Sequence, residues 1–341
     1  MTESQANGNG NEPLVQVRDL KKWFAVQSGV LERLMAGKTD YVHAVDGVTF
    51  NIERGEVFGL AGESGSGKTT IGRLVIHLEE PTEGEVRFDG MKLSDLSSEQ
   101  LRDLRRRMQV IFQDPMASLN PRMTIGQSVK HPLEIHYPER KSEHPEMVEE
   151  MLERVGLTPP DFFYDKYPHQ ISGGQRQRVV IARALVTRPD FILADEPIAM
   201  ADVSVRAQLL DLMQELKDEF NLTFLFITHD LATAKYICDR IGVMYLGKLA
   251  EVGELREVYS KPLHPYTQAL LAAVPVPNPH ERRTQPMPEG EIPDAIAPPS
   301  GCRFHPRCPI ARLPHCAEEE PELRELRPNH YVACHYAEDF L

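Results

Sequence analysis

Apolar and polar residues alternate along two early segments of the chain, residues 14–24 and 43–52. Alternation with a period of two predicts β-strands that bury one face. The turn-prone residues 53–56 follow the second segment, so we expect the two strands to form an antiparallel layer. Residues 27–39, between the two segments, are predicted to form a loop or a short helix.

Further along the chain, short apolar strands alternate with helical patterns. Continuous apolar runs at residues 57–61, 191–194 and 222–228 predict buried strands. Residues 69–77 and the segment that follows Gly174 have helical spacing. Buried strands that alternate with helices are typical of a parallel sheet covered on both faces, so the sequence indicates an α/β fold.

Three other stretches depart from this pattern. Residues from about 114 to 168 are charged and have helical spacing, for example over 147–155, which predicts a separate helical subdomain. Eight prolines fall between residues 274 and 299 and indicate a linker or a wrapped arm. Residues 1–12 are rich in Asn and Gly and are predicted to form a loose tail.

Composition narrows the class of protein. The chain has 341 residues, 41% of them apolar, which is enough for one large domain and an appendage. Its most apolar runs, residues 222–227 and 269–274, are shorter than the roughly 18–20 residues that cross a bilayer. A net charge of −13 argues against a nucleic-acid partner, because that affinity comes mainly from clustered lysine and arginine.

A glycine-rich segment between the predicted strand at 57–61 and the helix at 69–77 fits the phosphate-binding pattern G-x-x-x-x-G-K-[ST]. We expect Lys68 to reach the β- and γ-phosphates and the Thr69 hydroxyl to ligate Mg²⁺. The residues of the predicted nucleoside triphosphate site are Gly62, Glu63, Ser64, Gly65, Ser66, Gly67, Lys68, Thr69 and Thr70.

The apolar run at 191–194 ends in two acids, Asp195 and Glu196. An acid at the carboxyl end of a parallel strand beside the phosphate loop can hold Mg²⁺ through water, and we expect this of Asp195. Glu196 then faces the γ-phosphate, where its carboxylate can polarise the attacking water. The pair favours an enzyme that hydrolyses its nucleotide.

A second helix start with small residues lies far downstream of the phosphate loop. It consists of Ser172, Gly173, Gly174 and Gln175. Together the two segments resemble the ATP-binding-cassette (ABC) ATPases, in which two cassettes pair head to tail and each signature closes on the partner's nucleotide. The resemblance implies ATP as the nucleotide and a P-loop cassette with a parallel core sheet, an antiparallel β-layer and a helical subdomain.

Three further positions match the ABC pattern. Gln113 resembles the Q-loop glutamine, which contacts Mg²⁺ and the water, and His229 resembles the switch histidine that binds the γ-phosphate. Asp202 matches the D-loop acid, but residues 198–201 before it lack the small polar residues that are usual in the family. Ile171 replaces the usual leucine before the signature, which is a conservative difference.

The resemblance also implies an aromatic ring that stacks on adenine, upstream of the phosphate loop. Aligning residues 20–24 with the family's first strand makes Phe24 the first choice. Trp23 and Tyr41 are the alternatives.

Three C-terminal segments resemble the extension of oligopeptide and dipeptide importer ATPases. They are Lys-Pro-Leu-His-Pro-Tyr-Thr at 261–267, Cys-Arg-Phe-His-Pro-Arg-Cys-Pro at 302–309 and Val-Ala-Cys-His at 332–335. The implied organisation is a disordered tail over 1–12, a nucleotide-binding domain over 13–260 with its helical subdomain at about 114–170, and a Cys-containing extension over 261–341.

Four of the five cysteines lie in this extension: Cys302, Cys308, Cys316 and Cys334. Their spacing matches neither a zinc finger nor a bacterial ferredoxin, although four thiolates suit Zn²⁺, and His305, His315 or His335 could replace one of them. Some members of the resembling family hold a [4Fe–4S] cluster on this set. We therefore expect iron–sulfur first, zinc second and thiols without metal third, and we expect Cys238 to be a small core residue.

The resemblance implies an ATPase on the cytoplasmic face of the membrane, bound peripherally to two transmembrane permease subunits and paired with a second ABC ATPase subunit, a paralogue or another copy. An extracytoplasmic receptor would act indirectly. Oligopeptides or dipeptides are the expected cargo, and short oligosaccharides are the alternative.

Two rival classes are weaker. A soluble ABC ATPase of translation or DNA repair usually fuses two cassettes, which this chain lacks. A regulatory cassette with a dead site is disfavoured because Lys68, Gln113, Glu196 and His229 are all present.

Overall fold

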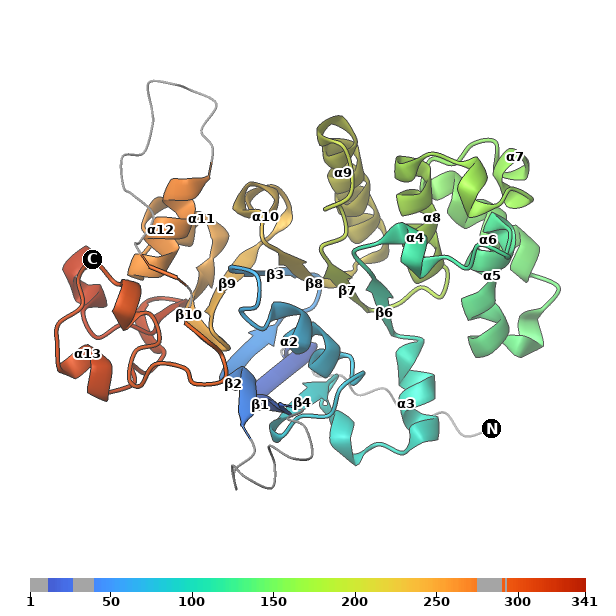
Figure 1. Cartoon of the computed structure of the whole chain (residues 1–341). Helices are drawn as coiled ribbons and strands as arrows, with labels where there is room; N and C mark the ends of the chain where they lie inside the picture. The colour runs from blue at the N-terminus through green and yellow to red at the C-terminus, as the bar shows by residue number, and fades with distance from the viewer. Residues whose placement is uncertain (1–11, 27–39, 275–289, 292) are drawn as a thin grey trace, which may run out of the picture. The chain divides into compact units, whose positions relative to one another are not determined.

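The computed structural model describes residues 12–26, 40–274, 290–291 and 293–341 (Figure 1). The expected loop at 27–39, most of the tail and most of the proline-rich arm lie outside these residues. The chain divides into two compact units. The first unit comprises residues 1–53, 58–94 and 228–341, and the second comprises residues 54–57 and 95–227.

An antiparallel sheet of four strands forms one part of the first unit, in the order β2-β1-β4-β5. Its strands are β1 (Val15–Ala25), β2 (Tyr41–Ile52), β4 (Glu83–Phe88) and β5 (Met91–Lys92). Val15 pairs with Ile52 and Phe24 pairs with Val42, so the predicted antiparallel layer is confirmed. Val15, Val17 and Leu20 are buried, as the alternation of apolar residues requires.

A second group of strands in this unit joins two strands of the C-terminal extension to a strand from earlier in the chain. The parallel strands β3 (Val57–Ala61) and β9 (Arg240–Tyr245) are followed by antiparallel β10 (Lys248–Glu254), β12 (His330–Val332) and β11 (Arg324–Arg327). The helices are α2 (Lys68–Val75), α10 (Leu231–Ile237), α11 (Leu255–Ser260), α12 (Pro265–Ala273) and α13 (His315–Glu318). The extension is therefore part of the first unit and adds two strands to β10.

A buried carboxylate joins β12 to β10. Glu251 of β10 is fully buried and accepts hydrogen bonds from the Leu263 amide at 2.8 Å and the His264 amide at 3.0 Å. The His330 Nε2 atom of β12 lies 2.7 Å from a Glu251 oxygen. Burial lowers the pKa of His264 to about 4, so His264 is neutral at pH 7.

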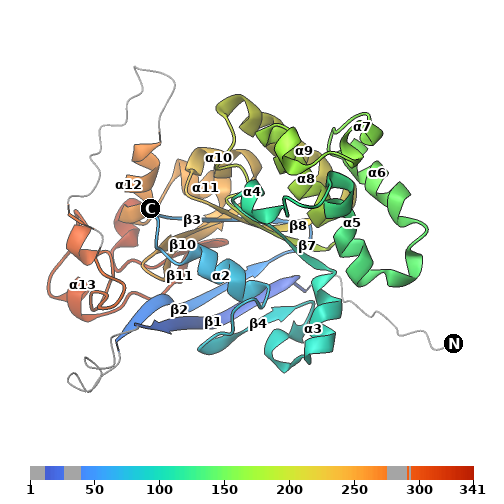
Figure 2. The ribbon, with the colours of Figure 1, turned by 45° about the vertical axis from the view of Figure 1, so that its right-hand side comes forward.

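The second unit contains the other parallel strands and most of the helices. The strands β6 (Met108–Ile111), β7 (Phe191–Asp195) and β8 (Thr223–Thr228) pair in parallel, with β7 in the middle. The helices are α3 (Ser98–Arg105), α4 (Pro115–Ser118), α5 (Ile125–His136), α6 (His144–Arg154), α7 (Pro160–Tyr164), α8 (Gly173–Leu185) and α9 (Val203–Phe220). Figure 2 shows α5, α6 and α7 grouped beside α8, so the stretch predicted to be helical is helical.

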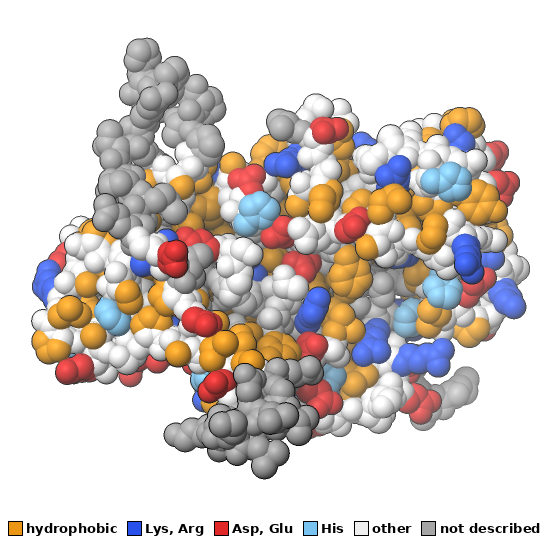
Figure 3. All heavy atoms as spheres, in the orientation of Figure 1, with side chains coloured by type: hydrophobic (Ala, Val, Ile, Leu, Met, Phe, Trp, Pro, Cys, Tyr) orange, Lys and Arg blue, Asp and Glu red, His pale blue; other side chains and the backbone are white. Residues whose placement is uncertain are grey.

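The surface adds two observations. On the face shown in Figure 3, basic side chains lie interspersed with acidic and hydrophobic ones and do not form one continuous patch. Among the residues that the structure describes, no helix is both long and apolar enough to cross a bilayer.

Candidate functional site

The glycine-rich loop follows β3 and turns tightly into α2. Gly62 and Gly67 have φ of 150° and 104°, in the region that favours glycine. A Cβ on Gly62 would collide with the Met244 carbonyl, and one on Gly67 would collide with the Ala44 carbonyl. The loop backbone therefore packs directly on the backbone of β2 and β9, and no larger residue fits at these two positions.

Lys68, the first residue of α2, is almost fully buried within this loop. Its ammonium donates to the Gly62 and Glu63 carbonyls, each at 2.8 Å, and lies 3.4 Å from the Ser66 hydroxyl. The positive charge is thus held near the N-terminus of α2, where the first backbone amides have no partner within the helix. This arrangement suits a phosphate chain, which accepts hydrogen bonds from both the ammonium and the amides.

The acids predicted to follow β7 lie in the second unit. Asp195 is the last residue of β7. Glu196 follows it with φ of 48°, which is unusual for a residue other than glycine. The Glu196 amide donates to the Ile227 carbonyl at 3.0 Å, and the Gln113 side-chain amide donates to the Glu196 carboxylate, also at 3.0 Å. The structure therefore brings the predicted Q-loop glutamine to the predicted catalytic glutamate.

The predicted signature begins α8 in the second unit. The Ser172 hydroxyl accepts from the Gln175 amide at 3.2 Å, and the Gln175 side chain accepts from the Ser172 amide at 2.9 Å. This capping box satisfies the Gln175 amide of the first turn, and the amides of Gly173 and Gly174 have no hydrogen-bond partner among the described residues. Ser172 and Gly173 are exposed, so the helix start is open to an anion.

The D-loop acid Asp202 precedes α9 and is exposed. Its side chain makes no capping hydrogen bond, but its carbonyl accepts from the amides of Val205 and Arg206, each at 2.9 Å. The Arg206 side chain donates to the Ala201 carbonyl at 2.9 Å. The unusual residues before Asp202 therefore form an ordered turn.

His229 lies in the first unit, directly after β8, and is exposed. Its neighbours fix the turn around it: the Thr228 hydroxyl accepts from the Asp230 amide at 3.0 Å, and Asp230 caps α10 by accepting from the Ala232 amide at 2.9 Å. The turn leaves His229 accessible to solvent, which a contact with a γ-phosphate requires.

The three aromatic candidates for adenine stacking differ in their surroundings. Phe24 is 38% exposed, and the Lys22 ammonium lies 5.0 Å from its ring centre. Trp23 instead donates its indole N–H to Asp46 at 3.2 Å and contacts a histidine ring. Tyr41 is 44% exposed on the neighbouring strand.

The extension contacts the glycine-rich loop, and this was not predicted. Arg307 lies 3.1 Å from the Glu63 carboxylate, and the Glu63 amide donates to the Tyr266 hydroxyl at 3.0 Å. Arg307 and Tyr266 belong to the two segments, 302–309 and 261–267, whose likeness to importer ATPases was recognised. Their contact with the loop was missed because no sequence spacing links Glu63 to a residue more than two hundred positions away.

The four cysteines of the extension line one small cavity together with His305 and His335. The Cys302 amide donates to the Cys316 carbonyl at 2.9 Å. Burial raises the pKa of Cys302 to about 12 and that of Cys334 to about 11, so these thiols are protonated at pH 7.

The expected iron–sulfur cluster is nevertheless not supported by the structure, since no group of three or more Cys, His, Asp or Glu in the described residues is arranged to hold a metal ion. Each candidate histidine has another partner. The hydrogen-bonded pairs are His305 with the Cys302 carbonyl, His315 with the Tyr336 hydroxyl and His335 with the Glu319 carbonyl. Cys238 is buried after α10, as predicted for a core residue.

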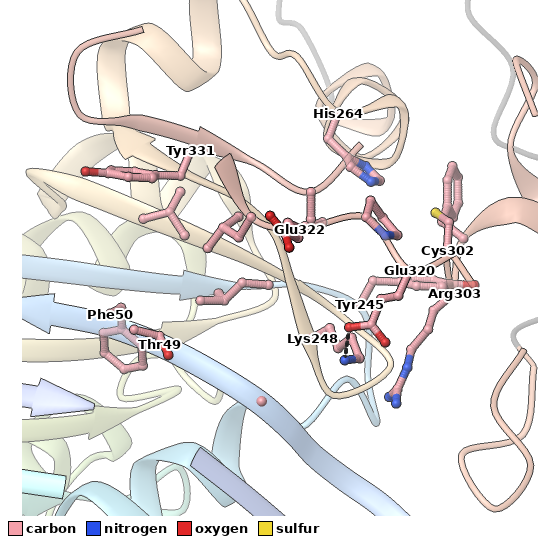
Figure 4. A pocket seen from close by; sticks show the side chains of 18 of the residues that line it. Thr49, Phe50, Tyr245, Lys248, His264, Cys302, Arg303, Glu320, Glu322 and Tyr331 are labelled. Carbon is pink, nitrogen blue, oxygen red and sulfur yellow. Dashed lines mark hydrogen bonds and ion pairs between the residues drawn. The ribbon is translucent and has the colours of Figure 1, made fainter. Parts of the chain in front are cut away.

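A larger cavity, of about 510 Å³, lies between β2, β10 and the extension, and the sequence pattern did not predict it. Figure 4 shows Tyr331 on one side of it and Arg303 on the other. Two of its cationic side chains form ion pairs within the protein: Lys248 pairs with Glu320, and Arg303 pairs with Asp46. These ion pairs join the extension to β2 and β10.

Comparison with known proteins agrees with this geometry. Residues 45–199 match the family model described as ABC transporter, and residues 250–316 match the one described as oligopeptide/dipeptide transporter, C-terminal region. The chain is 50% identical over 327 residues to the oligopeptide transport ATP-binding protein AppF of Bacillus subtilis, covering 95% of this chain and 97% of that protein. It is 45% identical over 324 residues to the dipeptide transport ATP-binding protein DppF of Haemophilus influenzae, covering 95% and 97%.

Among solved structures, the chain is similar to a dimeric post-hydrolysis state of the ATP-binding cassette MJ0796 bound to ADP and Pi. The TM-score is 0.60 at 32% identity, over 71% of this chain and 99% of that one. The predicted α/β cassette fold is therefore confirmed.

Proposed function

This chain belongs to the ABC transporter family, as an ATP-binding subunit of the oligopeptide/dipeptide type, and from that membership we propose how its residues act. It is an ATPase, and it powers an importer. The observation that carries the proposal is the 50% identity that extends over 95% of the chain, through both the nucleotide motifs and the extension.

The glycine-rich loop binds MgATP before hydrolysis. The Lys68 ammonium exchanges its two carbonyl partners for phosphate oxygens, and the loop amides complete the cradle. Thr69 and Asp195 would hold Mg²⁺, which would offset the negative charge of the phosphates when bound. Adenine stacking is assigned to Phe24 on its position in the family's first strand, and its exposure allows this role, whereas the Trp23 indole is held by Asp46.

Hydrolysis then depends on the residues after β7. Glu196 orients and polarises the attacking water. Gln113 positions the Glu196 carboxylate through its hydrogen bond and would contact Mg²⁺. His229 hydrogen-bonds the γ-phosphate from its exposed turn. These groups act by position and charge, which is how most phosphoryl transfer is accelerated.

The signature serves a second cassette. The open amides of Gly173 and Gly174, with the helix dipole of α8, suit the γ-phosphate of a nucleotide bound to a partner ATPase subunit. Asp202, the residue before α9, would link this signature site to the site of the partner's nucleotide, as the family resemblance implies. The likeness to a dimeric cassette supports this pairing.

The subunit works peripherally at the cytoplasmic face of the membrane, on two permease subunits that receive cargo from an extracytoplasmic receptor. Closure of the cassette pair on ATP and reopening after hydrolysis drive the permease, because ATP binds the closed state more tightly. The cargo is a short peptide, which the names of AppF and DppF support.

The first prediction tests the cargo. The importer, reconstituted in vesicles with its permeases, partner cassette and receptor, is expected to take up labelled di- to pentapeptides with MgATP, and peptide is expected to stimulate ATP hydrolysis. Lys68→Ala in the same complex should remove both activities, because the phosphate chain loses its main cation. Stimulation and uptake by short oligosaccharides but not by peptides would overturn the peptide assignment.

The second prediction concerns the cysteines. Their side chains in the described residues are not arranged as a metal site, and we propose from the family resemblance alone that they hold a [4Fe–4S] cluster. All four line one cavity, and a reducing compartment disfavours disulfides there. When bound, the cluster would cross-link parts of the extension that lie far apart in sequence, residues 302–308, 316 and 334. Protein purified without oxygen is expected to be brown and to contain about four iron and four sulfide per chain.

Two variants make this test specific. Cys316→Ser should remove the iron and the colour, whereas Cys238→Ala, which removes a thiol outside the cavity, should retain both. Colourless protein with one zinc per chain would show a four-thiolate zinc site instead, and protein without either metal would show ordinary thiols.

A further inference from the structure

The inference starts from an ion pair that joins the extension to the phosphate loop. The Arg307 Nη1 atom lies 3.1 Å from the Glu63 carboxylate, and the two side chains are only 7% and 18% exposed. Glu63 is the second residue of the loop, and its carbonyl accepts from the Lys68 ammonium at 2.8 Å. The same residue thus touches both the extension and the lysine that binds phosphate.

A second contact fixes the backbone at this position. The Glu63 amide donates to the Tyr266 hydroxyl at 3.0 Å, and the Tyr266 side chain is 1% exposed. Burial raises the pKa of Tyr266, so the hydroxyl stays neutral. The loop therefore begins against an immobilised side chain of α12.

The contacts of Glu63 with Arg307 and Tyr266 adjoin one aromatic cluster next to the cysteine cavity. The rings of Tyr245 and Tyr266 lie 4.7 Å apart, and Phe304 lies 5.3 Å from the first and 5.4 Å from the second. Cys302 and Cys308 pack against this cluster. Arg307 is the residue before Cys308, so the segment that carries the thiols also carries the cation.

We infer that Arg307 and Tyr266 are positioning residues of the ATP site, through which the extension sets the affinity of the phosphate loop for MgATP. Arg307 neutralises a carboxylate that would otherwise repel the phosphate chain from a poorly solvated position. Tyr266 holds the Glu63 peptide in the orientation that keeps its carbonyl toward Lys68. The inference rests on the proposed role of the loop in binding MgATP.

Variants that remove the charge of Arg307 or Glu63 distinguish a positioning role in the ATP site from support of the fold alone. Arg307→Met in the full chain is expected to weaken MgATP binding about tenfold, since the Glu63 charge is left uncompensated near the phosphates. Adding Glu63→Gln to Arg307→Met should restore most of the affinity, because the repelling charge is then gone. Titration calorimetry with the slowly hydrolysed analogue ATPγS and Mg²⁺ measures the dissociation constants.

In the complete importer, loss of the ion pair between Arg307 and Glu63 should change KM for ATP and leave kcat nearly unchanged. Arg307→Met should raise KM for ATP while kcat stays within about twofold, as expected for loss of binding that is equal in ground and transition states. Arg307→Lys should recover part of the affinity. Tyr266→Phe, which removes the acceptor for the Glu63 amide, should weaken binding about threefold.

The matched control is Arg312→Met, which breaks an ion pair with Asp339 elsewhere in the extension and should leave MgATP affinity unchanged. The inference is overturned if the double variant binds no better than Arg307→Met, because that result shows that Arg307 only stabilises the extension. It is also overturned if Arg307→Met binds like the wild type while Lys68→Ala does not. Wild-type binding by Lys68→Ala would instead reject the role of the loop itself.

Discussion

Glu196→Gln is expected to retain MgATP but to lose about 10²- to 10⁴-fold in turnover, the range assigned to a general base. The amide keeps the shape of the side chain and its hydrogen bond to Gln113, yet it cannot polarise water. With hydrolysis blocked, the cassette pair should stay closed on ATP. ATPase assays of the complex measure the first effect, and size-exclusion chromatography of the full-length cassettes with MgATP measures the second.

A control separates the reacting carboxylate from a general loss of charge. Glu149 is an exposed carboxylate on α6 of the same unit, so Glu149→Gln should hydrolyse ATP at the wild-type rate. Near-wild-type hydrolysis by Glu196→Gln would assign the base to another group.

Gly173→Asp is expected to abolish ATP-driven pairing while MgATP affinity of the single cassette changes less than about twofold. An acid at the start of α8 would repel the partner's γ-phosphate from amides that otherwise bind it. Gly173 suits this test because a Cβ there meets nothing within 4 Å. Gly174 is less suitable, because its Cβ would lie 3.0 Å from a Val205 methyl group and would disturb the packing of α8 on α9.

Pairing is measured by sedimentation of full-length cassettes with ATP, and affinity by calorimetry. Gly173→Ala is the matched variant, since it adds a side chain without charge in the same open space and should pair nearly as well as the wild type. If Gly173→Asp lost MgATP affinity as fully as Lys68→Ala, the signature would serve its own nucleotide rather than the partner's.

Local patterns predicted much of the fold. The alternation along β1 and β2 and the apolar runs of β3, β7 and β8 depend on burial of each residue against near neighbours, so they are visible in the sequence. The glycine-rich loop and the cap at Ser172 were predictable for the same reason. Their chemistry is set by consecutive backbone amides.

Other contacts depend on residues far apart in the chain. Nothing in the spacing of the extension shows that β12 pairs with β10, or that Arg307 reaches Glu63. The hydrogen bond from Gln113 to Glu196 likewise joins residues 83 positions apart. Family likeness indicates the roles of Gln113 and Glu196, but the contacts between such distant residues are visible only in the folded chain.

Because Glu251 is buried, the chain cannot be shortened near residue 260, between the nucleotide-binding domain and the extension, without removing the partners of this carboxylate. A chain that ended there would lose β12, and β10 would present an unpaired strand edge open to other chains. It would also lose the Leu263 and His264 amides and His330, leaving a carboxylate without counterparts inside the protein. A shortened cassette should therefore aggregate, and exchange of the extension between homologues by recombination should succeed only when β10 is inherited with it.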